Sequence, residues 1–217
     1  MKMKLAFEVV GKGDPLVILH GLLGSADNWL SMSRRLGAHY QVFALDLRNH
    51  GRSPHSDILD YDVMVADVRE FMEQQALRRI MLLGHSLGGK VAIQFAIDYS
   101  EQVDRLVIVD IAPKPYEPSQ RYLLKAMRAL DLTRYKSFAD VDAALAPEVS
   151  SESLRQFLLK NLTRDENSRI RWKSIWRRSI RTTINSCGSF RRSEALTNPP
   201  YSSAAADRII LKMMTRD

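Results

Sequence analysis

Residues 80–99 read IMLLGHSLGGKVAIQFAIDY, and this stretch decides the fold. An apolar run at 80–83 is followed by a Gly-x-Ser-x-Gly motif at 84–88 and by a helical pattern that continues to residue 99. The motif predicts a sharp turn from strand to helix, because only glycine tolerates the close neighbours of a serine held on such a turn. We therefore expect the hydroxyl of Ser86 to stand clear of the sheet edge where a helix begins.

The serine hydroxyl needs a base, and the chain does not supply one in the usual place. A hydroxyl is a weak nucleophile until a neighbouring group takes its proton, and after a turn of this kind a carboxylate and then a histidine normally follow in the chain. The five histidines are at positions 20, 39, 50, 55 and 85, so none follows Ser86. The sequence thus predicts a nucleophile without its usual base.

Length and composition indicate one ordinary globular domain with an unusual end. The chain has 217 residues, of which 45% are hydrophobic and 26% are charged. Its net charge of +7 comes almost entirely from residues 173–217, which hold nine basic and three acidic residues. These charges lie in one anomalous segment rather than on a folded face, and no recognition motif accompanies them, so we expect no nucleic-acid partner.

Neither a metal, a cofactor nor a membrane is expected as a partner. Cys187 is the only cysteine, which excludes an intramolecular disulfide and a cysteine-based metal site, and no His, Cys or carboxylate cluster has ligand spacing. The N-terminus alternates like a strand, and no run of 18 apolar residues occurs. We therefore expect a cytoplasmic protein in a reducing compartment, with an oligomeric state that the sequence does not indicate.

Short apolar runs alternate with helical patterns, which predicts an α/β fold: a mainly parallel, doubly wound sheet with helices on both faces. Strands are expected at 4–9, 16–19, 41–45, 80–83 and 105–109, and helices at 29–36, 61–75 and 87–99. From Pro113 onward, three prolines precede three helical stretches, at 120–130, 139–145 and 152–161. The predicted organisation is a core at 1–112, a helical lid at 113–172 and a basic tail at 173–217.

Four motifs give the chain a specific resemblance. They are HGLLGS at 20–25, DLRNHGRSP at 46–54, the Gly-x-Ser-x-Gly turn, and DIAP at 110–113. Together they resemble the α/β-hydrolase superfamily, and within it the bacterial esterases of the YbfF type and their relatives of the abhydrolase-11 type. A lone Gly-x-Ser-x-Gly would be weak evidence, whereas four motifs at the family's spacing, over about residues 3–172, are strong.

The resemblance implies a chemical role for four residues. Ser86 would be the nucleophile, and the backbone N–H groups of Leu22 and Leu87 would bind the oxyanion. Asp110, at the end of a strand, would be the acid of a Ser-Asp-His triad, orienting an imidazole and stabilising its charged form. The alternative for Asp110 is a capping role in a helix or turn.

The other polar residues of these motifs are expected to be structural. His20 follows a strand and is interpreted as a turn residue rather than a base. The side chain of His85 should point away from the nucleophile. Asp46, Arg48, Asn49 and His50 are expected to hold a loop that borders the site.

The resemblance ends near Trp172. The family carries two further strands and a late histidine there, whereas this chain reads SIWRRS at 174–179 and PPYSS at 199–203. When the third base of each codon is read with the first two bases of the next, codon choice permits NLEAIxxNY across 174–183 and TLFIRGGGSDYI across 199–211. Both strings resemble the family, so we interpret the chain from about residue 173 as out of frame, with its last strands missing and Cys187 accidental.

The expected function is serine hydrolysis of a small carboxylic ester or acyl thioester, with the chain nearly inactive as written because the histidine is absent. Two alternatives remain open at this point. One is a catalytically dead module that binds an acyl ligand or a protein partner. The other is a different enzyme of the same fold, such as a carbon–carbon hydrolase, which the turn around Ser86 does not exclude.

Overall fold

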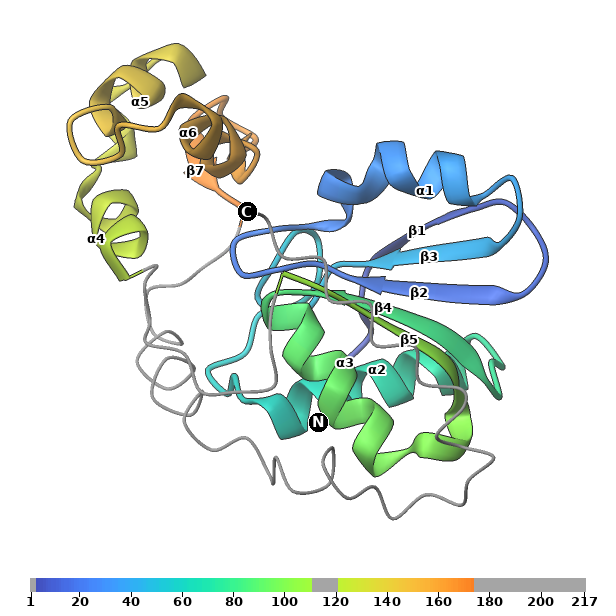
Figure 1. Cartoon of the computed structure of the whole chain (residues 1–217). Helices are drawn as coiled ribbons and strands as arrows, with labels where there is room; N and C mark the ends of the chain where they lie inside the picture. The colour runs from blue at the N-terminus through green and yellow to red at the C-terminus, as the bar shows by residue number, and fades with distance from the viewer. Residues whose placement is uncertain (1–2, 111–120, 174–217) are drawn as a thin grey trace.

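The computed structural model describes residues 3–110 and 121–173 and contains the predicted α/β core (Figure 1). Five strands form one sheet in the order β1-β3-β2-β4-β5. They are β1 (Phe7–Val10), β2 (Pro15–Leu19), β3 (Gln41–Leu45), β4 (Ile80–His85) and β5 (Val103–Val109). β1 pairs antiparallel with β3 and the other pairs are parallel, which confirms the mainly parallel sheet.

Helices cover both faces of the sheet, as a doubly wound fold requires (Figure 1). One face carries η1 (Ala26–Trp29) and α1 (Leu30–Leu36), and the other carries α2 (Tyr61–Gln74) and α3 (Leu87–Asp98), with η2 (Ser100–Gln102) before β5. Successive side chains of β2 point to opposite faces of the sheet, which explains why each face has its own apolar cluster. Leu16 and Ile18 lie in the apolar cluster under α1, whereas Val17 and Leu19 lie in the cluster under α2 and α3.

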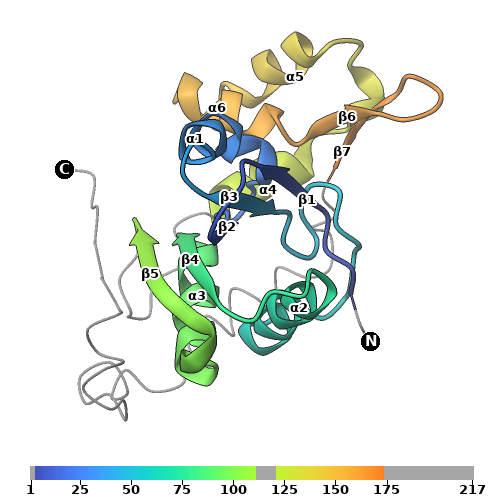
Figure 2. The ribbon, with the colours of Figure 1, turned by 90° about the vertical axis from the view of Figure 1, so that its right-hand side faces the viewer.

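A second apolar core belongs to residues 121–173, within the segment predicted to be a lid. Its elements are α4 (Arg121–Ala129), η3 (Leu132–Arg134), α5 (Phe138–Leu145), α6 (Glu152–Leu159), β6 (Leu162–Arg164) and β7 (Ile170–Trp172). Their buried residues, including Met127 and Leu158, form a cluster that also contains Leu23 of the core. In Figure 2, β4 and β5 point toward the end of the molecule where this lid lies.

Residues 121–173 also contain an antiparallel hairpin, formed by β6 and β7, which the sequence did not predict. The turn between them is held by Asp165, whose Oδ1 accepts the backbone N–H groups of Asn167 and Arg169, both at 2.9 Å. Three-residue strands are too short to show a period in the sequence. Buried Leu162 and Ile170 place one side of the hairpin in the lid core.

The edge strands of the described sheet are β1 and β5, and two further segments with predictions lie outside the described residues. The predicted strand at 4–9 is β1, displaced to Phe7–Val10. Within the described part of the chain β5 is an edge strand, next to β4 alone. The proline-rich connection after Asp110 and the tail at 174–217, including Cys187, lie outside the described residues.

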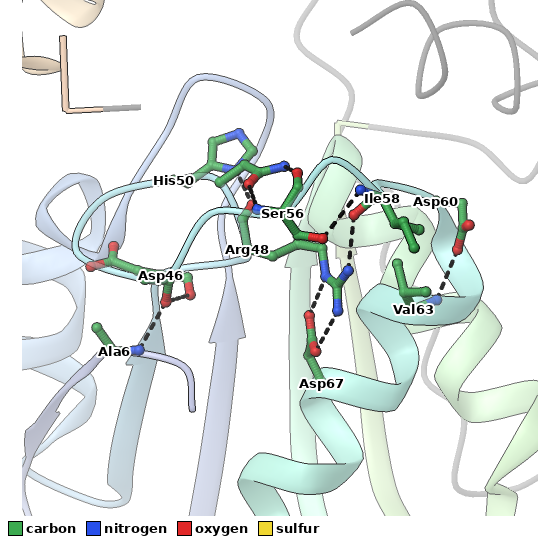
Figure 3. Close-up of polar contacts among 11 residues, drawn as sticks. Ala6, Asp46, Arg48, His50, Ser56, Ile58, Asp60, Val63 and Asp67 are labelled. Carbon is green, nitrogen blue, oxygen red and sulfur yellow. Dashed lines mark hydrogen bonds and ion pairs between the residues drawn. The ribbon is translucent and has the colours of Figure 1, made fainter. Parts of the chain in front are cut away.

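A buried ion pair ties the loop after β3 to α2 (Figure 3). The guanidinium of Arg48 donates from Nε and Nη2 to the two carboxylate oxygens of Asp67, at 2.5 and 2.7 Å, and from Nη1 to the carbonyl oxygen of Ile58 at 2.9 Å. Burial raises the pKa of the Asp67 carboxyl, and the hydrogen bonds from Arg48 oppose that rise. The bidentate geometry fixes where the loop leaves the sheet.

We predict that Arg48→Met lowers the free energy of unfolding by about 3–5 kcal/mol, because it leaves the Asp67 carboxylate buried without its partner. The matched control is Arg79→Met, which breaks the exposed pair between Arg79 and Asp104 and should cost about 0–1 kcal/mol. Denaturant unfolding monitored by circular dichroism measures both. Equal losses in the two variants would show that the Arg48 pair does not hold the loop.

Candidate active site

Ser86 lies on the predicted sharp turn between β4 and α3. Its backbone has φ 50° and ψ −113°, a region that L-residues rarely adopt, and its N–H donates to the carbonyl oxygen of Val109 on β5 at 3.1 Å. Holding a non-glycine residue there costs on the order of 1–3 kcal/mol, which surrounding contacts must offset. The turn brings the half-buried serine to the start of α3, as the sequence predicts.

Close backbone approach explains the glycine two residues after the serine. A Cβ added to Gly88 would collide with the carbonyl oxygens of Leu19, which ends β2, and His20, which follows it. The N–H of Gly88 instead donates to the carbonyl oxygen of His20 at 3.1 Å. The first turn of α3 is therefore fastened directly to the loop that follows β2.

That loop, residues 20–24, lies against the serine. A Cβ added to Gly21 would stand 3.2 Å from the Cβ of Ser86 and 2.8 Å from Nδ1 of His85. Leu23 has φ 63°, and the N–H of Gly24 donates to the carbonyl oxygen of Gly21 at 2.9 Å, closing a tight turn. Within the described residues, the N–H groups of Leu22 and Leu87 have no hydrogen-bond acceptor.

His20 is structural, as expected from the sequence. Its ring is 1% exposed, with Nδ1 donating to the carbonyl oxygen of Gly21 at 2.8 Å and Nε2 accepting the N–H of Leu47 at 3.0 Å. These two partners require the neutral ring. Burial, helped by the nearby ring of His50, lowers the pKa of His20 to about 3. Both ring nitrogens are thus used within the fold, which leaves neither to act as a base.

The His20 hydrogen bond also orients a peptide group. The Gly21 carbonyl and the Leu22 N–H belong to one planar trans peptide unit and point in opposite directions. Fixing the carbonyl oxygen with two donors, from His20 and Gly24, therefore fixes the direction of the Leu22 N–H.

The polar residues at 46–54 are also structural. The buried Asp46 carboxylate accepts the backbone N–H of Ala26 at 2.7 Å and that of Arg52 at 3.0 Å. Asn49 holds Ser56 through two hydrogen bonds, at 2.7 and 2.9 Å. His50 donates from Nδ1 to the carbonyl oxygen of Arg48 at 2.8 Å, and burial lowers the pKa of this imidazole.

Asp110 follows β5 at the same edge of the sheet as Ser86. The strands pair His85 with Val109, so the residues after them, Ser86 and Asp110, leave neighbouring strands side by side. Asp110 has φ 55°, and its side chain is 56% exposed. Its Oδ2 lies 3.6 Å from Nε2 of His85, a contact that sequence reasoning missed because it depends on the strand register.

The described residues contain no group of three or more His, Cys, Asp or Glu side chains that could hold a metal ion. Among the helices of residues 3–110 and 121–173, none has the length and apolar character needed to cross a membrane.

We predict that the buried histidines make the protein less stable in acid. The pKa of His20 in the folded chain lies below its value near 6.5 in the unfolded chain, so the unfolded state binds the extra proton as the pH falls from about 6.5 toward 3. The free energy of unfolding should fall across that window by about 1.4 kcal/mol per pH unit through His20 alone.

Urea unfolding at a series of pH values measures this slope in the wild-type chain, in His20→Asn and in His39→Asn. The slope in His20→Asn should be smaller than in the wild-type chain by about the contribution of one proton. His39→Asn, which removes an exposed imidazole, is the matched control. Identical slopes in all three proteins would contradict a neutral, buried His20.

Comparison with known proteins agrees with this geometry. The α/β hydrolase fold family model matches residues 14–202. The sn-1-specific diacylglycerol lipase ABHD11 of Xenopus laevis is 40% identical over 169 residues, covering 74% of this chain and 54% of the relative. Esterase YbfF of Escherichia coli is 31% identical over 153 residues, covering 70% and 60% respectively. A solved marine microorganism esterase superposes with a TM-score of 0.83 at 38% identity, covering 87% of this chain and 74% of that one.

The resemblance inferred from four motifs is thereby confirmed. The chain spans 53–57% of the length of the three ABHD11 relatives from frogs and zebrafish, so those proteins contain more than this chain does. The family match and the strand–turn–helix around Ser86 lead to the same conclusion. This chain belongs to the α/β-hydrolase fold family.

Proposed function

We propose that this chain is built for serine hydrolysis of a carboxylic ester or acyl thioester. The observation that carries the proposal is the position of Ser86, on a strained turn at the start of α3 and in contact range of the loop at 20–24. Strained backbone held by surrounding structure is a recurrent feature of functional sites. Here Leu23, Ser86 and Asp110 all have positive φ.

In the proposed mechanism, the Ser86 hydroxyl attacks the acyl carbon, and the carbonyl oxygen takes up negative charge. The N–H groups of Leu22 and Leu87 would bind that oxygen, and they suit the task because both are fixed before the charge develops. The bond from the acyl carbon to the alcohol oxygen or thiol sulfur then breaks, and the proton lost by Ser86 leaves with that group. Water hydrolyses the acyl-serine, which releases the acid and returns a proton to the Ser86 oxygen. No cofactor takes part in this scheme.

Asp110 would orient and stabilise an imidazole that this chain does not contain. The relation of Asp110 to Ser86 supports the role, since both follow paired residues of neighbouring strands. Removing a triad histidine can cost about a million-fold in rate, while oxyanion binding and substrate positioning leave roughly a thousand-fold or more over water. We therefore propose that the chain as written is nearly inactive.

The relatives support an ester as the substrate. One is named a diacylglycerol lipase and another an esterase, and both names describe proteins that act on ester bonds. We extend that bond type to this chain as part of the proposal, with a core at 1–112, a lid at 113–172 and an out-of-frame tail from about residue 173. Neither acyl length nor leaving group enters the proposal.

We predict slow labelling of Ser86 by a fluorophosphonate probe. The serine is placed to react, but no imidazole takes its proton. Labelling should require hours rather than minutes and should disappear in Ser86→Ala, with Ser56→Ala as the matched serine control. Mass spectrometry identifies the labelled residue. Rapid labelling, or steady p-nitrophenyl ester turnover that depends on Ser86, would show that another base acts.

We also predict that restoring the alternative reading frame from about codon 173 produces a longer chain with a histidine and esterase or thioesterase activity. Ser86→Ala and loss of the new histidine should lower kcat by similar factors, because triad members act as a unit. Asp110→Asn should also lower kcat heavily, since it favours the wrong imidazole tautomer.

The DNA sequence around codon 173 and ester kinetics of the repaired chain test this. A shifted frame that stops early, or a repaired chain indifferent to Asp110→Asn, would contradict the prediction. A substrate panel that includes carbon–carbon bonds separates an esterase from another enzyme of this fold.

A second candidate function is a catalytically dead module that binds an acyl ligand or a protein partner. It is favoured by one observation, the absence of any histidine after Ser86. Tight ligand binding by a monodisperse sample, unaffected by Ser86→Ala, would support it over hydrolysis.

A further inference from the structure

A lid residue makes direct contact with the loop at 20–24. Asn161 follows α6, is 3% exposed, and donates from Nδ2 to the carbonyl oxygen of Leu23 at 2.8 Å and to that of Leu158 at 3.3 Å. Because both partners are carbonyls, the amide nitrogen and not the amide oxygen must face them. The contact joins residues 138 positions apart in the chain.

Asn161 is itself held in place. Its N–H donates to the carbonyl oxygen of Leu158 at 2.9 Å, and its own carbonyl oxygen accepts the N–H of Lys173 at 2.6 Å. The side-chain amide therefore comes from a segment anchored to both α6 and the end of the hairpin. A buried donor anchored in this way has little freedom to follow the loop if the loop moves.

The loop is shared between the two apolar cores. Leu23 is 1% exposed and lies in the lid cluster, while Leu22 packs against both the lid cluster and the cluster under α2 and α3. The core side holds the loop through the His20 and Gly21 carbonyls, and the lid side holds it through the Leu23 carbonyl. The Leu22 N–H lies between these two attachments.

We propose that Asn161 is a positioning residue that acts through the Leu23–Gly24 peptide to help hold the Leu22 N–H in place, so that seating of the lid and assembly of the oxyanion site are coupled. Leu23 has φ 63°, and its buried carbonyl would lose its donor if the lid moved away. An unsatisfied buried carbonyl favours rotation of the peptide groups around it. The Leu23 carbonyl and the Gly24 N–H belong to one peptide unit, so its rotation would withdraw the Gly24 N–H from the Gly21 carbonyl oxygen. That oxygen would keep only the His20 donor, and the Leu22 N–H of the same peptide unit would be held less firmly in the oxyanion position. This inference rests on the proposed function only for the role of Leu22.

Hydrogen exchange, measured on the full chain, tests whether Asn161 holds the loop at 20–24. Asn161→Asp replaces the donor by an oxygen that repels the Leu23 carbonyl, while keeping the shape of the side chain. Peptides that span residues 20–26 should exchange at least about tenfold faster in this variant, with the peptides of β4 unchanged. The matched control is Asn167→Asp, the same change at an exposed position in the turn between β6 and β7. Unchanged exchange at 20–26 in Asn161→Asp would overturn the proposal.

Labelling of Ser86 by the fluorophosphonate probe tests whether Asn161 also affects the proposed oxyanion donor, the Leu22 N–H. The limiting rate constant should fall about ten- to a hundredfold in Asn161→Asp, while the half-saturating probe concentration stays within about twofold, because a displaced oxyanion donor acts on the transition state. A merely structural loss would change both constants or neither, and that result would overturn the positioning role. If no variant is labelled at Ser86, the proposed function fails, and the exchange result still decides whether Asn161 holds the loop.

A wild-type measurement covers the case in which Asn161→Asp does not fold. In denaturant-dependent native-state exchange, peptides covering 20–26 and 152–162 should open in one step with the same free energy. Opening of the loop at denaturant concentrations that leave the lid protected would overturn the coupling.

Discussion

The site depends on one close contact between two backbones, that of the β2 loop and that of the first turn of α3. The N–H of Gly88 donates to the carbonyl oxygen of His20, and any side chain at Gly88 would push the two apart. Because Ser86 directly precedes α3 and Leu22 lies on the loop, this contact sets the distance between the proposed nucleophile and one proposed oxyanion donor. Packed backbone therefore sets this distance. The distance varies less than one set by two flexible side chains would.

Neutral histidine makes that backbone arrangement possible. His20 must donate through Nδ1 and accept through Nε2 at once, which only the uncharged ring does, and its burial keeps the ring uncharged. The same ring links the loop at 20–24 to Leu47, which begins the segment held by Arg48 and Asp67. The loop that borders Ser86 is thus connected to α2 in two steps. His20 accepts the N–H of Leu47, and the next residue, Arg48, forms the buried ion pair with Asp67 of α2.

The sequence predicted the parts of the molecule that local pattern controls. Apolar runs located the strands, the glycines around Ser86 located the strand-to-helix turn, and the order of four motifs indicated the family. Contacts that need register or long-range packing were missed. The approach of His85 to Asp110 depends on which residues of β4 and β5 face each other, and the hydrogen bond from Asn161 to Leu23 joins segments whose neighbourhood no local pattern encodes. The hairpin of β6 and β7 was missed because three-residue strands are too short to display alternation.

The groups that set the geometry of the proposed site and the group that would accept the Ser86 proton come from different parts of the chain. The proposed nucleophile, the two proposed oxyanion donors and the glycines that let them approach all lie between residues 20 and 88, within the segment that builds the central strands. The base, in the proposed mechanism, would come from a part of the chain that follows Asp110. A chain can therefore fold the first group completely and still lack the second. In the proposed mechanism, the Asp110 carboxylate, 56% exposed and 3.6 Å from the ring of His85, would support an imidazole from a later segment. Backbone donors would stabilise the negative charge on the substrate's carbonyl oxygen without supplying a proton acceptor for Ser86, so the two contributions to the rate would multiply rather than substitute for one another.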